Sequence, residues 1–328
     1  MKLSILGVPT SLGARNGGTE KAPCALRRAG IRERVLSGGH DVEDRGDQEE
    51  TPFAPDPDPA RRKQRNLPGV AAVARTLAGR VESVLREGRK LLVLGGDCTV
   101  ALGSLAGISR IHGEAGLAYL NRDADLNTPA TSPSGILDGM VISHLLGRGV
   151  SELARMEGPA PLLRPARLAL LGVERLDPQE VPVFEALPSF RIRAPEIRRD
   201  GGTAVAREAL RRIAEQGRPF FVHFDVDVVD SAEIPAVDIP APGGISGDEA
   251  GLLIAGMAAS PGFLGIEVTN FNPDRDPGGR AALRVVEILG AALGKGIKEF
   301  RKGLQGDENK PPESQDASKK PPEGGAAA

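Results

Sequence analysis

Two aspartates, Asp225 and Asp227, close an apolar run and are the residues best placed to do chemistry. The run from Phe220 reads FFVHFDVDVVD, the pattern of a buried parallel strand. Because side chains alternate along a strand, both carboxylates are expected to point the same way, with roughly 6.7 Å between their backbone positions. Two buried like charges need a cation, a proton or an arginine. The pair predicts a divalent-metal site; bonding to loop amides and arginines is the alternative.

Further polar clusters follow three other strand-like runs. GGDCTVALG, with Cys98, follows Lys90–Leu94, and NRDADLNTP follows Gly116–Leu120. GVERLDPQE follows Arg167–Leu171. Ligands of open α/β sheets gather where the carboxyl ends of strands meet. The sequence therefore predicts one polar site at one edge of a sheet. Its candidate residues beside the aspartate pair are Asn121, Asp123, Asp125, Asn127, Glu174, Asp177, Glu180 and Asp230.

The elements that position these clusters alternate between strand and helix. Leu3–Gly7 is a further strand-like run, a weaker strand pattern covers Gly262–Val268, and helical patterns separate these runs. This alternation predicts a parallel sheet with helices on both faces. We expect one α/β domain over residues 1–301, and a disordered tail over 302–328, where almost nothing is apolar. The helical patterns are Val70–Glu87, Thr99–Ile108, Thr203–Gln216 and Asp248–Ala259.

Composition narrows the class of protein. A formal charge of −2 over 328 residues gives no general electrostatic reason to expect nucleic acid or a membrane surface as partner. No apolar run approaches the roughly 18–20 residues that cross a bilayer, and the N-terminus lacks the apolar core of a signal peptide. Cys24 and Cys98 lie in different segments. We expect a cytoplasmic protein without disulfides.

The order of motifs along residues 1–300 resembles the ureohydrolase family, which includes arginase, agmatinase and formimidoylglutamase. The motifs are GVPTSLG, DVEDRGD, GGDCT, NRDADLNTP, SGILDGM, FDVDVVD, PAVDIPAPGG and FNPD. The resemblance implies a three-layer α/β/α sandwich with a mostly parallel sheet of about eight strands, assembled as a homotrimer or homohexamer. It also implies a small polar, amino-acid-like substrate and two manganese ions bridged by hydroxide. That hydroxide would attack the guanidinium or amidine carbon of the substrate and release urea or a similar product.

The residues that match the family's metal ligands depart from it in type at three positions. Cys98 and Asp123 stand where the family has histidines, and Asn121 stands for the aspartate that bridges both metals. Four carboxylates remain, so the electrostatic demand for cations survives. One Mn²⁺ ion, two, another divalent metal or an empty site all stay open. The candidate metal ligands are Cys98, Asn121, Asp123, Asp125, Asp225 and Asp227.

The residues that match the family's reaction and substrate positions are also mixed. Asp138 takes the place of the proton-transfer histidine, a role that requires a raised pKa, and Asp125 is the second catalytic candidate. Asn270 takes the place of the glutamate that holds the guanidinium, and Glu267 does not replace it in this register. The positions that hold an amino-acid head group keep the expected types at Asn127, Ser134, Asp177 and Glu180.

Two hypotheses follow from this pattern. The first is a divergent metal-dependent hydrolase that cleaves a C–N bond of a linear amidine or amide of amino-acid type. The second is a catalytically inactive relative that binds an amino-acid-like ligand or serves as an assembly subunit. His223 bears on both, since it shares a face with Asp225 and is either a metal ligand or its support. A buried histidine bonded to a backbone carbonyl is the reading we favour.

Overall fold

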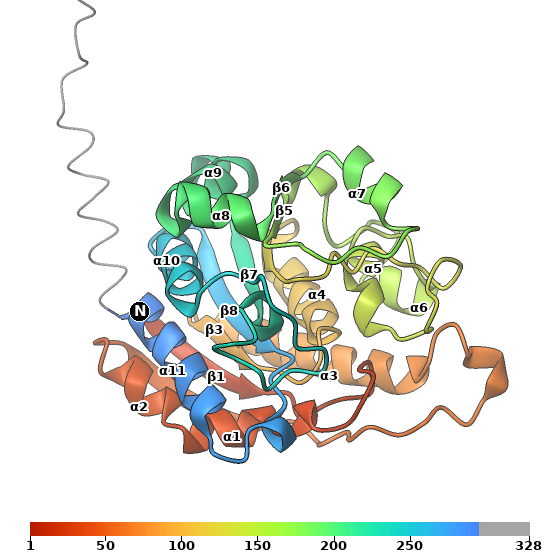
Figure 1. Ribbon diagram of the computed structural model, residues 1–328, viewed down its shortest axis with the longest axis horizontal. Coiled ribbons are helices and arrows are strands. Elements are labelled where there is room, and N and C mark those ends of the chain that lie inside the picture. The colour runs from red at the N-terminus through yellow and green to blue at the C-terminus, as the bar shows by residue number, and fades with distance from the viewer. Residues whose placement is uncertain (295–328) are drawn as a thin grey trace, which may run out of the picture.

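The computed structural model describes residues 1–294, which form one sheet of eight parallel strands between two layers of helices (Figure 1). The predicted tail, 302–328, lies outside the described residues. The strand order is β2-β1-β3-β8-β7-β4-β5-β6, and every neighbouring pair is parallel. The strands are β1 (Lys2–Gly7), β2 (Asp41–Asp47), β3 (Lys90–Leu94), β4 (Gly116–Leu120), β5 (Leu168–Leu171), β6 (Phe190–Ile192), β7 (Phe220–Asp225) and β8 (Phe263–Thr269).

The helices divide between the two faces of the sheet. α3, α4 and α5 pack on one face, whereas α2, α9, α10 and α11 pack on the other. The predicted α/β/α sandwich is therefore confirmed. The helices are α1 (Ala22–Arg28), α2 (Ile31–Leu36), α3 (Leu67–Arg86), α4 (Val100–His112), α5 (Val141–Leu145), α6 (Ser151–Ala154), α7 (Val181–Ala186), α8 (Ala194–Asp200), α9 (Gly202–Ile213), α10 (Gly247–Ala258) and α11 (Arg280–Leu293).

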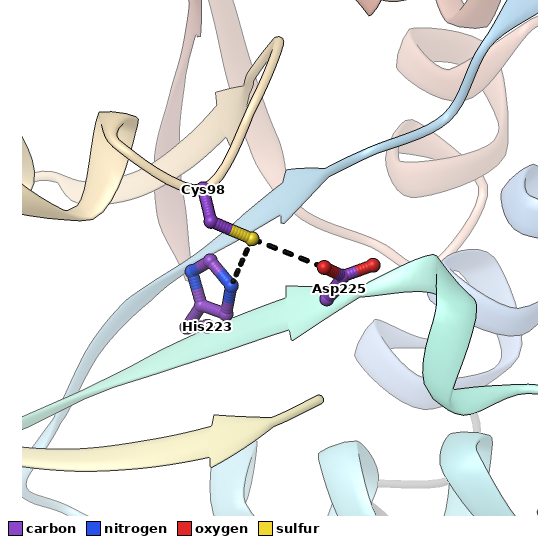
Figure 2. Close-up of side chains that lie close together, drawn as sticks. All are labelled: Cys98, His223 and Asp225. Atoms are coloured by element: carbon purple, nitrogen blue, oxygen red, sulfur yellow. Dashed lines mark hydrogen bonds between the residues drawn. The ribbon is translucent and has the colours of Figure 1, made fainter. Parts of the chain in front are cut away.

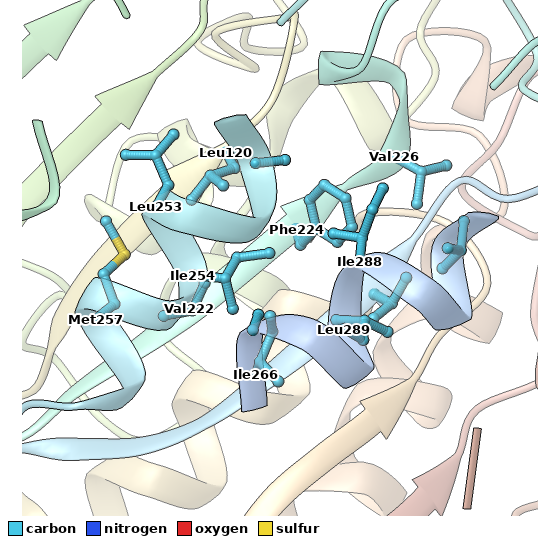
Figure 3. Close-up of a cluster of buried hydrophobic side chains, with 14 of the residues drawn as sticks. Leu120, Val222, Phe224, Val226, Leu253, Ile254, Met257, Ile266, Ile288 and Leu289 are labelled. Carbon is cyan, nitrogen blue, oxygen red and sulfur yellow. The ribbon is translucent and has the colours of Figure 1, made fainter. Parts of the chain in front are cut away.

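Alternation along β7 decides which side chains reach which layer. Val222 and Phe224 enter the core beneath α10 and α11 (Figure 3). Phe221 enters the core beneath α3 and α4. His223 and Asp225 share the parity of Phe221, so they project on the α4 side of the sheet.

Two strands were not predicted from the sequence, and both lie at the edges of the sheet. β2 reads DVEDRGD, and only Val42 in it is buried. β6 spans three residues, of which only Ile192 is buried. An edge strand with one covered position carries little apolar pattern. Within residues 1–294, no helix is long and apolar enough to cross a membrane.

His144 on α5 makes stability depend on pH. Its ring is fully buried, Nδ1 lies 2.7 Å from the carbonyl of Met140, and burial lowers its pKa to about 4. Below the unfolded pKa of about 6.5 the unfolded chain binds the extra proton, so stability falls as pH falls. Between pH 7 and pH 5 we expect this residue to remove about 2 kcal/mol of unfolding free energy.

Urea unfolding of the wild type and of His144→Asn at both pH values isolates that contribution. Asparagine keeps a donor for the Met140 carbonyl but does not titrate. The difference in unfolding free energy between the two proteins should shrink by about 2 kcal/mol at pH 5. An unchanged difference would show that the imidazole is not held neutral.

Candidate functional site

Cys98, His223 and Asp225 meet at the carboxyl end of the sheet and are fully or almost fully buried (Figure 2). Cys98 lies in the loop between β3 and α4, and the other two side chains come from β7. The Cys98 thiol donates to Asp225 Oδ2 at 3.0 Å, and its Sγ lies 3.3 Å from His223 Nε2. Burial, reinforced by the charge of Asp225, raises the pKa of the thiol well above its usual value. The cluster combines sulfur, nitrogen and oxygen donors.

His223 is held by a carboxylate rather than by a backbone carbonyl. Nδ1 lies 2.7 Å from Glu267 Oε1, and Ser104 donates to Glu267 Oε2 at 2.6 Å. The Tyr119 ring stacks on the imidazole at 4.1 Å between centroids. This corrects the favoured reading from the sequence. His223 and Glu267 are register partners on β7 and β8, and that register is not visible in the sequence.

Asn270 covers the cluster on its open side. Its backbone is left-handed, with φ 61°, and its N–H donates to the Gly96 carbonyl at 2.7 Å. Its side-chain amide donates to Asp225 Oδ2 at 2.6 Å and to Cys98 Sγ at 3.2 Å. Asn270 therefore lies at the site, whereas Glu267 lies deeper in the sheet.

The loop that carries Gly96 leaves no room for a side chain. A Cβ at Gly96 would overlap the backbone of Thr10. We expect Gly96→Ala to lower the unfolding free energy by about 2–3 kcal/mol, because overpacking displaces the backbone that also fixes Asn270. Denaturant unfolding measures the loss. Gly79→Ala on α3, where nothing lies within 4 Å of the added carbon, is the matched control and should cost nothing. Equal stabilities of the two variants would contradict this packing.

Arg175 places a positive charge beside two of the acidic residues, Asp123 and Asp227. It forms a bidentate ion pair with Asp123, with Nε 2.5 Å from Oδ1, and its guanidinium lies 3.7 Å from Asp227 Oδ2. A short parallel bridge between Asp123 and Arg175 brings this loop alongside the end of β4. Sequence reasoning missed Arg175. One signal was available: Arg175 is the only basic residue in GVERLDPQE. The four carboxylates assigned to the metal site, Asp123, Asp125, Asp225 and Asp227, needed a cation.

Asn121 presents its nitrogen to the cluster. Its Oδ1 accepts from the Asp123 backbone N–H at 2.7 Å, which fixes the amide orientation. Its Nδ2 donates to Asp125 Oδ2 at 3.0 Å. An amide NH₂ is a donor and offers no lone pair to a metal. In this orientation Asn121 cannot bridge two ions.

The carboxylates of the site are strained electrostatically. Burial raises the pKa of Asp225, Asp125 and Asp138 well above the usual range, and neighbouring aspartates raise each further. Burial and Asp123 also raise the pKa of Asp227 to about 6 despite the opposing charge of Arg175. Asp125 has φ 48° and accepts from the Tyr119 hydroxyl at 2.5 Å. Such a cluster favours a proton or a cation.

The paired aspartates do not continue one strand as the sequence predicted. β7 ends at Asp225, and Asp227 lies in the 3-10 turn Val226–Val228. The Asp227 N–H donates to Asp225 Oδ1 at 2.8 Å, so the turn is capped by the first carboxylate. Both side chains still reach the same edge of the sheet.

A cavity of about 260 Å³ opens in front of this cluster. Among its lining residues seven are acidic and two, Arg15 and Arg175, are basic. The predicted head-group residues line it: Asn127 donates to Asp177 at 2.9 Å, and Ser134 lies on the same wall. Glu180 supports this wall by accepting from the Leu126 and Asp177 backbones. Asp138 also lines the cavity, and its carboxylate accepts from the Cys98 N–H at 2.6 Å.

The manganese pair implied by the family resemblance does not fit these side chains. The guanidinium of Arg175 already pairs with Asp123 beside Asp227, and Asn121 turns an N–H group inward. The donors around Cys98 are not compensated in this way, because no arginine or lysine in residues 1–294 forms an ion pair with Asp225. The site therefore has donors for one ion and an internal cation in the region of the other.

Comparison with known proteins places these features in a family. The model of the arginase family matches residues 1–294. The arginase of Bacillus caldovelox is 31% identical over 293 residues, which cover 89% of this chain and 98% of that protein. A solved structure of the Bacillus caldovelox arginase superposes with a TM-score of 0.83 over 89% of this chain and 98% of that one. Human arginase-1 is 33% identical over 277 residues, covering 83% of this chain and 85% of the relative.

Proposed function

The chain belongs to the arginase family, and from that membership we propose that it is a hydrolase that cleaves a C–N bond of a linear amidine or amide of amino-acid type. The cavity is the observation that carries the proposal. Its wall keeps the residue types that suit an amino-acid head group, and its acidic excess attracts a cation. An amino-acid amidine carries two cations, an α-ammonium group and an amidinium group. One such molecule would therefore place a positive charge at the head-group wall and another beside the remaining acidic residues of the cavity.

The side chains of the cavity divide the work by position. Asp177 would accept from the substrate ammonium, while Asn127 and Ser134 would donate to its carboxylate. Asp125 would hold the amidine or amide end, and Asp138 would move a proton to the leaving nitrogen. Asn270, between the cavity and the buried cluster, would orient the reacting carbon. The proposal includes assembly as a homotrimer or homohexamer and a cytoplasmic location, as the family membership supports.

A second function is favoured by the ion pair of Arg175 with Asp123. That pair compensates Asp123 and places a positive charge 3.7 Å from Asp227 without any metal, as suits a protein that only binds its ligand. In this reading the chain is a catalytically inactive relative that binds an amino-acid-like molecule or serves as an assembly subunit.

One experiment separates the two functions. The purified full-length chain is incubated with a panel of amino-acid amidines and amides, with and without added divalent metal. Released urea or ammonia and the melting temperature are measured for each compound. Turnover supports the hydrolase. A raised melting temperature without turnover supports the binding protein. The absence of both turnover and a melting-temperature shift would contradict the hydrolase and the ligand-binding protein, and would leave the assembly subunit.

Asp177 tests the head-group wall directly. With a compound that is turned over, we expect Asp177→Asn to raise KM about 10-fold or more with little change in kcat, because a uniform binding contact is removed. Asp274→Asn, at an exposed position paired with Lys21, is the control and should leave both constants unchanged. A fall in kcat with constant KM would move Asp177 from binding to the reaction.

A further inference from the structure

We propose that Cys98, His223 and Asp225 form a binding site for a single Zn²⁺ ion. The inference deepens the function proposed above, since it names the metal of the same pocket. The role of the ion in a reaction rests on that proposed function. Its binding rests only on the geometry of the three side chains. It replaces the six-residue manganese set expected from the sequence with three residues, one of which, His223, was outside that set.

The donor atoms are already gathered at the spacing of a metal site. One donor atom from each of the three side chains lies within 4.8 Å of the others. Ideal tetrahedral bonds of about 2.3 Å to sulfur and 2.0 Å to nitrogen or oxygen put neighbouring donors about 3.5 Å apart. The distances from Cys98 Sγ are 3.3 Å to His223 Nε2 and 3.0 Å to Asp225 Oδ2. A movement of a few tenths of an ångström would therefore admit an ion.

The chemistry of the set selects zinc over manganese. A thiolate and an imidazole are the ligands that Zn²⁺ prefers, whereas Mn²⁺ prefers carboxylate, carbonyl and water oxygens. In this chain Asp123 and Asp227, which offer only oxygen, are the residues that Arg175 pairs with or approaches. What remains unpaired with an arginine is the half that contains the sulfur.

The surroundings of His223 are those of a metal ligand. Its Nδ1 is engaged by Glu267, itself held by Ser104, and the stacked Tyr119 ring fixes the imidazole plane. This carboxylate–histidine arrangement leaves Nε2 facing Cys98 Sγ at 3.3 Å, with the Thr269 hydroxyl also at 3.3 Å. A histidine that only fills space in the core would not need Nδ1 bonded to a carboxylate, nor Nε2 facing the Cys98 sulfur.

Asn270 connects the three donors with the ligand cavity. Asn270 lies over Cys98 and Asp225 and also lines the cavity, so a small movement of its side chain exposes the ion. Three protein ligands with one open position are the arrangement of catalytic zinc sites. When bound, the ion would supply a polarising charge and an acidic water at the reactive end of the cavity.

The test uses the full-length protein with zinc and with cobalt as a spectroscopic substitute. After dialysis against chelator, incubation with Zn²⁺ and removal of the excess, elemental analysis should find one zinc per chain. Co²⁺ in its place should produce a thiolate-to-cobalt charge-transfer band in the near ultraviolet. Cys98→Ser should abolish the band, whereas Cys24→Ser should keep it, since that exposed cysteine lies elsewhere. His223→Gln should weaken zinc binding about 100-fold or more.

The spectrum of the wild type keeps the inference falsifiable even where a variant fails to fold. No retained zinc, or a cobalt spectrum without a thiolate band, would overturn it. The substrate panel is scored separately. Bound zinc with no turnover would support the site and reject the hydrolase, and turnover by a chain that retains no zinc would support the hydrolase and reject the site.

Discussion

Replacing Arg175 by glutamine is expected to raise the affinity for Mn²⁺ about 100-fold while lowering stability in metal-free buffer by about 2–3 kcal/mol. The guanidinium is the cation paired with Asp123 and beside the buried Asp227. Its removal leaves two carboxylates without that cation, a loss that partial exposure of Arg175 and Asp123 keeps below that of a fully buried pair. The same change removes a positive charge within about 4 Å of an incoming ion, which lowers the electrostatic cost of binding.

Calorimetric titration with Mn²⁺ and denaturant unfolding measure the two effects. Arg122→Gln is the matched control, because the neighbouring Arg122 guanidinium donates to the carbonyls of Ala241 and Pro242 and not to the carboxylates. Its manganese affinity should equal that of the wild type. Should Arg175→Gln bind Mn²⁺ no better than this control, the view of Arg175 as a built-in replacement for an ion would be wrong.

Replacing Glu267 by alanine is expected to cost about 4 kcal/mol of unfolding free energy. Glu267 is completely buried and is the partner of both His223 Nδ1 and the Ser104 hydroxyl. The variant would leave both of these polar groups without that partner in a dry interior and would open a cavity between β8 and α4. Each contribution alone is about 1–3 kcal/mol.

Urea unfolding in chelator-treated buffer measures this loss without interference from metal. Glu267→Gln keeps an acceptor for the imidazole and should recover at least half of it, while Ser104→Ala should cost about 1 kcal/mol. A loss below 1 kcal/mol for the alanine variant would show that His223 finds another partner, and the support inferred for the zinc site would fail.

The sequence predicted the parts of the fold that carry periodic apolar patterns. The strands that became β1, β3, β4, β5, β7 and β8 are buried along most of their length and were placed to within one or two residues. The ends of these strands also predicted where the polar residues gather, since parallel strands share one carboxyl edge. The type of fold and the position of the cavity followed from these two features.

Pairings between distant segments could not be predicted in the same way. That Arg175 meets Asp123 depends on the adjacency of β4 and β5, and that His223 meets Glu267 depends on the register of β7 with β8. A departure from a family motif shows which side chain was lost, as at Asn121. It does not show which unrelated residue has moved in to balance the charge.

The position of β8 in the sheet governs when the site can form. β3 and β7 are not neighbours, and within the sheet β8 joins the half built from β2, β1 and β3 to the half built from β7, β4, β5 and β6. Cys98 follows β3, whereas His223 and Asp225 lie on β7, so the cluster is split between the halves. During synthesis both halves emerge before residues 263–269, and their ends meet only after a loop closure of about 170 residues. The pocket is thus one of the last structures to assemble, and a chain that stops short of β8 would have its donors without a site.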